Sequence, residues 1–177
     1  MDRERSARHD LRTRLGAENV ECLLYGLYLG RGEQLVDNHT AIRHEFPHCR
    51  SWEVYKGILD GRSHAVFNGK VFVTPEAQKT DAKQTNRNLL LSDTARVDTK
   101  PQLEIFADDV KCTHGATVGR LDDLARFYAR SRGVPHAEAE RLLTYAFAAE
   151  VIEEVALEPV RSELDRLVLE RLQDQRG

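Results

Sequence analysis

Cysteine is scarce in this sequence of 177 residues, which contains only Cys22, Cys49 and Cys112. The three are far apart, odd in number, and form no Cys-x-x-Cys pair. This pattern excludes a disulfide framework and disfavours a closed zinc or iron–sulfur site built by one chain. We therefore expect any metal held here to need ligands from a second chain.

Long apolar runs are also missing. The stretch from Met1 to Arg14 is charged and lacks the apolar region of a secretory signal, and no segment is long enough to span a bilayer. A net charge of −3 and a pI near 6.2 provide no general basic field, which argues against nucleic acid as the main partner. We expect a soluble, cytoplasmic protein with one compact domain and a helical extension.

Short alternating apolar runs dominate the sequence up to about residue 119, and we interpret them as strands. These runs are residues 21–25, 54–59, 65–67, 71–73, 89–91, 103–105 and 110–112. The residues that favour tight turns between them are Asp60-Gly61, Asn68-Gly69, Ser92-Asp93 and Asp108-Asp109.

The spacing of the strand centres bears on the β architecture. Val73, Leu90 and Ile105 follow one another at short and nearly regular steps along the chain. These steps are too short for a strand–helix–strand unit and favour the stacked coils of a parallel β-helix (β-solenoid). An antiparallel sandwich is the alternative, which Asn68-Gly69 supports because this dipeptide is a common hairpin turn.

After residue 119 the apolar period changes to that of helices. Asp122 can cap a first helix that ends near Gly133. The apolar residues on one side of this helix are Leu124, Phe127 and Tyr128. A second amphipathic helix is predicted from His136 to about Glu158-Pro159, and a third carries an apolar stripe over residues 160–172.

The prediction is thus a mainly β protein with α-helices, in which a parallel β-helix core over residues 1–119 precedes a small C-terminal helical domain over residues 120–177. The helices either pack on each other or dock a partner.

Cys112 and His114 are the candidate functional residues. In a strand, their spacing places both side chains on one face, so a thiolate and an imidazole can approach one metal or one partner surface. Two other interpretations stay open. The pair can be packed groups of a structural dimerisation module. Alternatively, the chain is a β-helical acyltransferase or polysaccharide-active enzyme with His114 as general base, oriented by Asp108 or Asp109.

A second group of donors consists of His39, His44, His48 and Cys49. Their spacing matches no closed zinc pattern, and histidines at strand ends commonly form hydrogen bonds, so a metal site is the less favoured interpretation.

Several sequence blocks occur in a fixed order along the chain. They are residues 36–40, 47–51, 67–71, 77–82, 86–92, 98–105 and 112–117. Together they resemble the SufB/SufD family of the SUF iron–sulfur cluster assembly machinery, over nearly the whole chain. The match is to the C-terminal half of members of the SufD branch. Gly115 stands where SufB-type members carry the glutamate of a His-Glu-Ala-Thr motif, which points to this branch.

This resemblance implies a parallel β-helix core, a helical domain, and a scaffold subunit without catalytic turnover. It also implies a SufB-like partner subunit, a SufC-like ABC-type ATPase, and a transient iron–sulfur cluster shared between subunits. The sequence has no Walker-type Gly-Lys-Ser/Thr loop, so we expect the nucleotide on the ATPase partner. A homodimer is expected to be accessible to the isolated chain.

By position, His114 matches the family histidine at the SufB–SufD interface, where the nascent cluster is thought to form, and Cys112 matches the cysteine two residues before it. Thiolate and imidazole suit iron–sulfur precursors, and an incomplete donor set lets the product leave.

On the helices, the candidate contacts for the ATPase are Arg141, Leu142, Phe147 and Glu150. Phe147 is expected to act as an apolar anchor and Arg141 as a polar orienter.

One departure from the family concerns the N-terminus, where members carry a longer portion. We expect the first coil of this chain to present an unpaired strand edge, which the charged residues from Arg3 to Arg14 blunt.

Overall fold

The computed structural model describes residues 6–173. The strands over this range are β1 (Ser6–Leu15), β2 (Glu21–Gly30), β3 (Leu35–His44), β4 (Arg50–Leu59), β5 (His64–Val73), β6 (Asp81–Leu90), β7 (Arg96–Ile105) and β8 (Lys111–Gly119). The helices are α1 (Asp123–Ser131), α2 (His136–Ile152) and α3 (Glu158–Gln173). Residues 1–5 and 174–177 of the two predicted domains, including Arg3 to Arg5, lie outside the described range.

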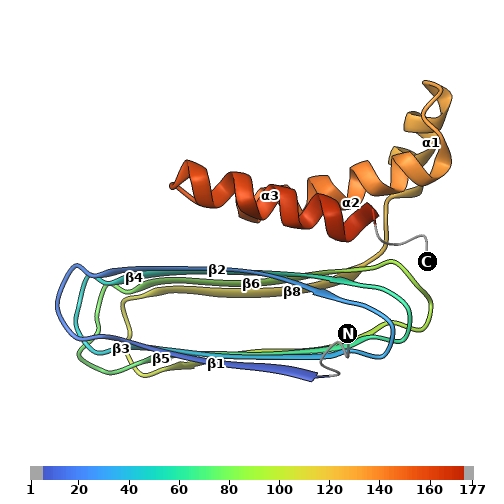
Figure 1. Ribbon diagram of the computed structural model, residues 1–177. Helices are drawn as coiled ribbons and strands as arrows, with labels where there is room; N and C mark the ends of the chain where they lie inside the picture. The colour runs from blue at the N-terminus through green and yellow to red at the C-terminus, as the bar shows by residue number, and fades with distance from the viewer. Residues whose placement is uncertain (1–5, 174–177) are drawn as a thin grey trace.

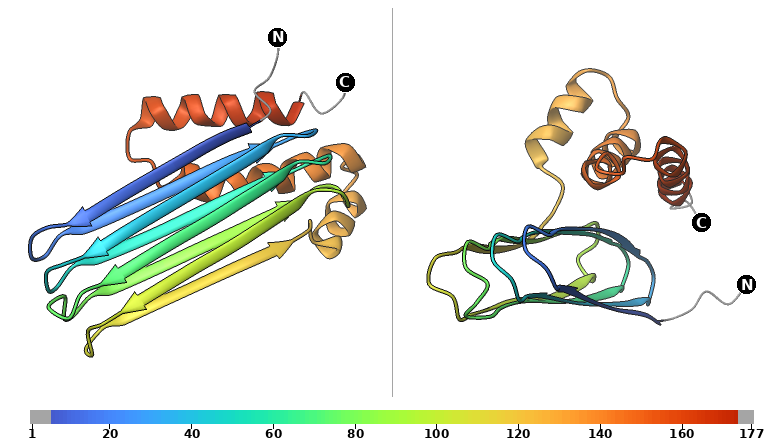
Figure 2. Two further views of the ribbon diagram at one scale, coloured as in Figure 1. Left: turned by 90° about the horizontal axis from the view of Figure 1, so that it is seen from below. Right: turned by 90° about the vertical axis from the view of Figure 1, so that its left-hand side faces the viewer.

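The strands form a flattened parallel β-helix, as predicted from the spacing of the strand centres. Odd-numbered strands make one sheet in the order β1-β3-β5-β7, and even-numbered strands make the other in the order β2-β4-β6-β8. The pairing is parallel throughout both sheets, which shows that the antiparallel alternative is wrong. Figure 1 shows the two sheets stacked face to face, and Figure 2 shows the strands side by side in each sheet.

One complete coil contains two strands, one from each sheet. Ser6 of β1 pairs with Leu35 of β3, the next strand of the same sheet, while β2 crosses to the other sheet in between. Val73, Leu90 and Ile105, predicted to be strand centres, are instead the last residues of β5, β6 and β7, so the predicted steps lead from β5 to β6 and from β6 to β7. Each step therefore corresponds to half a coil, from one sheet across to the other.

The prediction of a turn at Asn68-Gly69 is wrong, because both residues lie in the middle of β5. The two short runs on either side belong to this one strand. Gly69 faces the interior, where an added Cβ would lie 2.5 Å from the side-chain nitrogen of Gln84 and 2.8 Å from the Phe67 ring. A glycine is needed here for close packing across the interior and not for a hairpin. The other three predicted turns do lie between strands.

Apolar side chains fill the interior near the two ends of the strands. One buried cluster contains Tyr28, Leu59 and Ala65, and another contains Val71 and Val73. Burying a side chain of the size of valine or leucine contributes about 1.5–3 kcal/mol to stability. These aliphatic columns hold the coils in register.

A band of polar side chains lies in the interior between the apolar clusters. The buried members on the even sheet are Glu53, Gln84, Asn86 and Asn88. The Tyr28 hydroxyl donates a hydrogen bond of 2.5 Å to Asn88, and the Asn88 amide donates one of 2.7 Å to Asn86. Asn86 and Asn88 are thus satisfied within the chain, whereas Glu53 Oε1 and Gln84 Oε1 have no hydrogen-bond partner among residues 6–173.

Capping residues define the first helix as predicted. The Asp122 side chain accepts a hydrogen bond from the backbone N–H of Leu124, and Gly133 has a φ of +83° just beyond the helix. The prediction for the second helix is wrong at its C-terminal end, which is Ile152. Pro159 lies in the first turn of α3, where its missing N–H removes no helical hydrogen bond.

Helices α2 and α3 pack on the outer face of the even sheet (Figure 1). The buried residues of this contact are Ile58 from β4, Ala148 and Ile152 from α2, and Val168 and Leu172 from α3. None of the described helices is long and apolar enough to cross a membrane. The division into two domains at residues 119–120 stays a prediction.

Candidate functional site

The candidate pair lies on β8, the last strand of the even sheet. This strand pairs with β6 on one side, and its residues from Thr113 to Gly119 are all exposed. On the odd sheet, β7 is likewise the last strand, and its Pro101 is tolerated because an edge strand needs fewer backbone donors. Within residues 6–173 no strand pairs with the outer edge of β7 or β8, so the last coil presents two unpaired strand edges and a partly open interior.

Cys112 is half-buried and faces the interior of the last coil. Its side chain packs against the apolar cluster that contains Val71, Val73 and Ala82. Burial raises the pKa of the Cys112 thiol above its ordinary value. The thiol is therefore protonated at neutral pH in the isolated chain, and an electropositive partner such as a metal ion would be needed to stabilise the thiolate.

His114 is exposed and follows Cys112 on the same inward side of the strand. The predicted sharing of one face is thus confirmed by the strand geometry. In the register of the even sheet, Glu53 of β4 lies beside Gln84 of β6, which lies beside His114 of β8. The Gln84 side-chain nitrogen donates a hydrogen bond of 2.6 Å to the Glu53 carboxylate.

The sequence offered no indication of this polar row. Glu53 is fully buried, and burial raises the pKa of its carboxyl group although the Thr40 hydroxyl and the hydrogen bond from Gln84 act in the opposite direction. Only the register of the strands, which sequence spacing left undetermined, brings Glu53 and Gln84 into line with His114.

The second donor group is not brought together. His44 is fully buried, with its Nε2 atom 2.9 Å from the Ser51 hydroxyl, and burial lowers its pKa to about 4. His39 lies on the outer face of the odd sheet, 2.8 Å from an oxygen of Asp37. Cys49 is buried and donates to a backbone carbonyl. Residues 6–173 contain no cluster of three or more histidine, cysteine or acidic side chains suited to a metal ion.

The acidic residues proposed to orient His114 in an enzyme lie in the turn before β8. Asp109 forms an ion pair with Lys79, and its backbone N–H donates a hydrogen bond of 3.0 Å to the side-chain oxygen of Gln78. Asp108 is exposed. Asp109 is thus engaged with the neighbouring coil, and no observation favours the general-base interpretation.

The four helical candidates fall into two sets. Arg141 forms an ion pair with Glu138 on the same helix, and Leu142 is half exposed. Phe147 and Glu150 instead face the even sheet, where both contact Lys56.

Lys56 connects the sheet to α2. Its side chain is 1% exposed, and its Nζ atom lies 2.5 Å from the Glu150 carboxylate and 3.0 Å from the backbone oxygen of Phe147. The same atom lies 4.5 Å from the centre of the Phe147 ring. Arg87 adds a second ion pair to Glu150 at 2.9 Å. Phe147 and Glu150 therefore fix the position of α2 on the β-helix.

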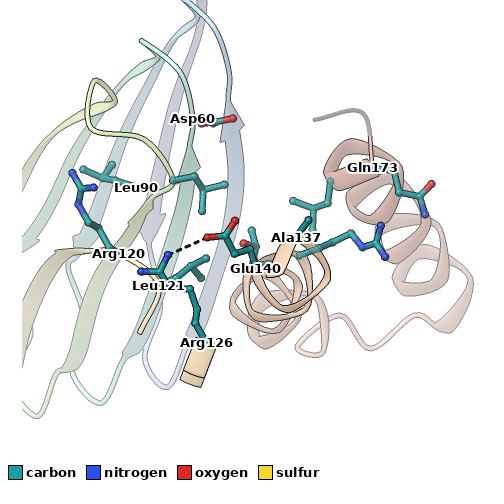
Figure 3. Close-up of a pocket in the computed structure, with 12 residues that line it drawn as sticks. Asp60, Leu90, Arg120, Leu121, Arg126, Ala137, Glu140 and Gln173 are labelled. Atoms are coloured by element: carbon teal, nitrogen blue, oxygen red, sulfur yellow. Dashed lines mark hydrogen bonds and ion pairs between the residues drawn. The ribbon is translucent and has the colours of Figure 1, made fainter. Parts of the chain in front are cut away.

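A cleft of about 330 Å³ lies between the strand ends and the helices (Figure 3). Three arginines line it: Arg120, Arg126 and Arg141. Each has an acidic partner, including Glu140, which lies 3.0 Å from Arg126 across the cleft. The cleft is a charge-balanced joint between the two parts of the chain and contains neither Cys112 nor His114.

Helix α1 exposes an apolar surface. Its residues belong to the helical domain predicted to dock the ATPase, but they were not among the four predicted contact residues. Leu124, Phe127 and Tyr128 are 73%, 70% and 60% exposed, and α1 has no buried residue. Figure 2 shows α1 standing away from the sheets. The signal was present in the sequence, because the three residues share one side of an amphipathic helix. Exposed apolar residues gathered in this way are typical of interaction surfaces.

Comparison with known proteins shows which family this sequence matches. Residues 3–147 match the family model described as SUF system FeS cluster assembly, SufBD core domain. The chain is also similar to the iron–sulfur cluster assembly protein SufD of Escherichia coli, with 43% identity over 165 residues that cover 93% of this chain and 39% of that protein.

Two further relatives have comparable similarity. A SufBD family iron–sulfur cluster assembly protein of Synechocystis is 41% identical over 92% of this chain and 36% of its own length. The SufD protein of Bacillus subtilis is 39% identical over 77% of this chain and 31% of its own length. The chain thus spans well under half the length of these relatives.

Proposed function

The chain belongs to the SufBD family of iron–sulfur cluster assembly proteins, and from this premise we propose that it acts as a non-catalytic scaffold in that process. In this proposal it pairs with a SufB-like subunit, binds a SufC-like ABC ATPase, and contributes donors to a nascent cluster. The open last coil is the observation that carries the proposal, because it presents unpaired strand edges beside a thiol and an imidazole.

Strand pairing is the proposed mode of contact with the SufB-like subunit. The free backbone groups along β7 and β8 are suited to hydrogen bonds with strands of a second β-helix. Such pairing would cover the interior of the last coil and bring donors from the partner towards Cys112 and His114. An isolated chain could use the same edges to form a homodimer.

Cys112 and His114 supply an incomplete donor set for the cluster, which is the cargo of the reaction. Both donor types bind iron in iron–sulfur proteins. Two donors from one subunit leave positions on the metal for the partner and for the acceptor that receives the product. Because burial raises the pKa of the Cys112 thiol, the thiol carries its proton, and metal binding has to release that proton.

The helical part is the proposed docking surface for the ATPase. Leu142 and the apolar side of α1 offer exposed contacts, and Arg141 precedes Leu142 on α2. Phe147 and Glu150 contribute by holding α2 against Lys56. Movement of the bound ATPase would then be transmitted through α2 to the coils on which it rests.

Anaerobic co-expression with SufB-like and SufC-like partners tests the donor role. The purified complexes of the parent and of His114→Ala are compared by visible absorption and by iron and sulfide content. We expect the His114→Ala complex to assemble but to hold much less cluster. His136→Ala, which removes an exposed imidazole on α2, should retain the parent content. Equal cluster content in the parent and His114→Ala complexes would refute the ligand role.

A binding assay with the cognate ATPase tests the docking surface. Arg141→Ala and Leu142→Ala should weaken binding without changing the fold. Phe147→Ala and Glu150→Ala should weaken it together with the attachment of α2. Unchanged binding by all four variants would remove this part of the proposal.

A further inference from the structure

The interior row that leads to His114 contains a buried amide oxygen with no partner. Gln84 is 1% exposed, and its Oε1 atom has no hydrogen-bond partner among residues 6–173. A buried acceptor that is left without a hydrogen bond lowers the stability of the fold. Such a group, beside the equally unpartnered Oε1 atom of Glu53, calls for a donor that the described residues do not supply in this conformation.

Glu53 fixes the direction of this amide. The Gln84 side-chain nitrogen donates to the Glu53 carboxylate at 2.6 Å, on the side of β4. Because the nitrogen and oxygen of an amide point in different directions, anchoring the nitrogen towards β4 turns the oxygen away from it. On the opposite side of Gln84 in the same sheet lies β8, and the residue in register is His114.

The residue opposite Gln84 leaves room for its side chain to extend across the interior. Gly69 lies across the interior, and a Cβ at that position would be 2.5 Å from the Gln84 nitrogen. The glycine therefore leaves room for an extended glutamine side chain. Neighbouring strands are about 4.8 Å apart, so inward side chains at paired positions are within reach of each other.

We infer that Gln84, anchored by Glu53, is a positioning residue for His114: its side-chain oxygen accepts a hydrogen bond from one ring N–H of His114 and presents the other ring nitrogen to the open seam. The bond forms when a partner covers the last coil and the exposed imidazole settles against the interior. A metal-binding histidine is commonly oriented through its second nitrogen in this way, and loss of the orienting group costs about 10–100-fold in metal affinity or activity. The inference rests on the proposed function, since it takes His114 as a cluster ligand.

The test uses the full complex, co-expressed anaerobically with SufB-like and SufC-like partners. Gln84→Met keeps most of the side-chain volume but removes the acceptor, and we expect the rate of cluster assembly to fall about 10-fold. The double variant Glu53→Gln/Gln84→Glu exchanges the two groups, so that the amide at position 53 donates to the carboxylate at position 84, whose other oxygen still faces His114, and it should restore much of the rate. Asn86→Leu is the matched control, because it removes another buried amide whose register partner on β8 is Ala116 and not His114.

A spectroscopic readout separates positioning from general stability. With ¹⁵N-labelled histidine in this chain, pulsed electron paramagnetic resonance of the reduced cluster reports the coupling to the ligand nitrogen. Gln84→Met should change or broaden this coupling, whereas Asn86→Leu should lower the thermal midpoint and leave the coupling of any assembled cluster as in the parent. An unchanged coupling and rate in Gln84→Met, or equal losses in both variants, would overturn the inference.

Glu53→Gln provides a second variant in case Gln84→Met does not fold. It preserves shape but allows the new amide to donate to Gln84, so that the Gln84 side chain can turn and its oxygen is drawn away from His114. We expect the same altered coupling, and a parent-like coupling would contradict the inference.

His114→Ala is measured in parallel. If His114→Ala loses cluster but the Gln84 variants behave as the parent does, only the positioning role is refuted. If His114→Ala loses no cluster, the ligand role of His114 in the proposed function is refuted.

Discussion

Strands β5 and β8 have nearly the same length and the same parallel geometry, but opposite exposure. In β5 every second residue is buried, because β3 and β7 pair with it on both sides. In β8 the residues are exposed except for the half-buried Cys112. The inward positions of β5 carry Phe67, Val71 and Val73, whereas those of β8 begin with Cys112 and His114.

This difference shows that the two strands serve different purposes in one coil stack. The inward side chains of β5 supply free energy to the fold, and in the proposed function those of β8 supply donors to a cluster at a subunit seam. A strand at the end of a stack can carry a thiol and an imidazole because it contributes little to the core. The same position makes these groups accessible to a partner.

The largest expected difference between the two strands is in the cost of removing an apolar side chain from each. Phe67 is fully buried, and Phe67→Ala should lower the free energy of unfolding by about 3–5 kcal/mol because it leaves a cavity in the core. Val118→Ala on β8 should change it by less than about 1 kcal/mol, since half of the side chain is already in water. Urea unfolding of both variants measures the two values. Similar losses would mean that β8 belongs to the core.

His44, a histidine of the closed interior, should make the free energy of unfolding depend on pH. Burial lowers the pKa of His44 to about 4 from the ordinary value of 6.5, so between these values the unfolded chain binds more protons than the folded chain. This contribution to stability is fully present above about pH 6.5 and falls by roughly 3 kcal/mol as the pH drops to 4.

Urea unfolding at pH 7 and pH 4.5 checks the effect in the parent and in His44→Gln. The variant should lose less stability between the two pH values than the parent. Parallel losses would show that His44 is protonated in the folded chain.

The same comparison of buried and exposed groups can be made for two ion pairs that involve the helices. Glu150→Ala leaves the buried ammonium group of Lys56 with the backbone oxygen of Phe147 as its remaining close acceptor. We expect a loss of about 1–3 kcal/mol, towards the lower end because half of the Glu150 side chain is exposed. Chemical denaturation monitored by helix content measures it. Glu163→Ala, which removes an exposed partner of Arg166 on α3, should leave stability nearly unchanged.

The smallest effect on stability is expected at α1. Phe127→Ser replaces a side chain that is 70% exposed, so the free energy of unfolding should stay within about 0.5 kcal/mol of the parent. Binding of the ATPase partner should nevertheless weaken if this surface docks it. A large loss of stability would instead show that α1 packs against the body of the protein in solution.

Much of the fold follows from local patterns in the sequence. Strand spacing predicted the coils, and Asp122 and Gly133 located the ends of α1. The errors arose where tertiary packing decides. Asn68-Gly69 has the composition of a turn, but Gly69 is selected by the nearby Gln84 side chain. The end of α2 was misplaced because Pro159 can either end one helix or begin the next.

The part of the candidate site that depends on local spacing was predictable, and the part that depends on strand register was not. The spacing of Cys112 and His114 placed both on one face of a strand, and the structure confirms this. The row from Glu53 through Gln84 to His114 depends on which residues pair across strands that lie a whole coil apart in the sequence. No local pattern in a single sequence encodes that register.

Coil length in this protein is not constant, because the step along the chain from Ser6 to its partner Leu35 is shorter than the step from His64 to its partner Arg96. Strands β1 and β5, where these steps begin, are equally long. The differences in coil length are therefore absorbed mainly by the turns. Insertions or deletions at the corners should be tolerated, since they alter neither pairing nor orientation. One added residue within a strand would turn every following side chain of that strand to the opposite surface, exchanging inside for outside. For β8, such a shift would move the imidazole of His114 from the lumen to the face that looks towards solvent.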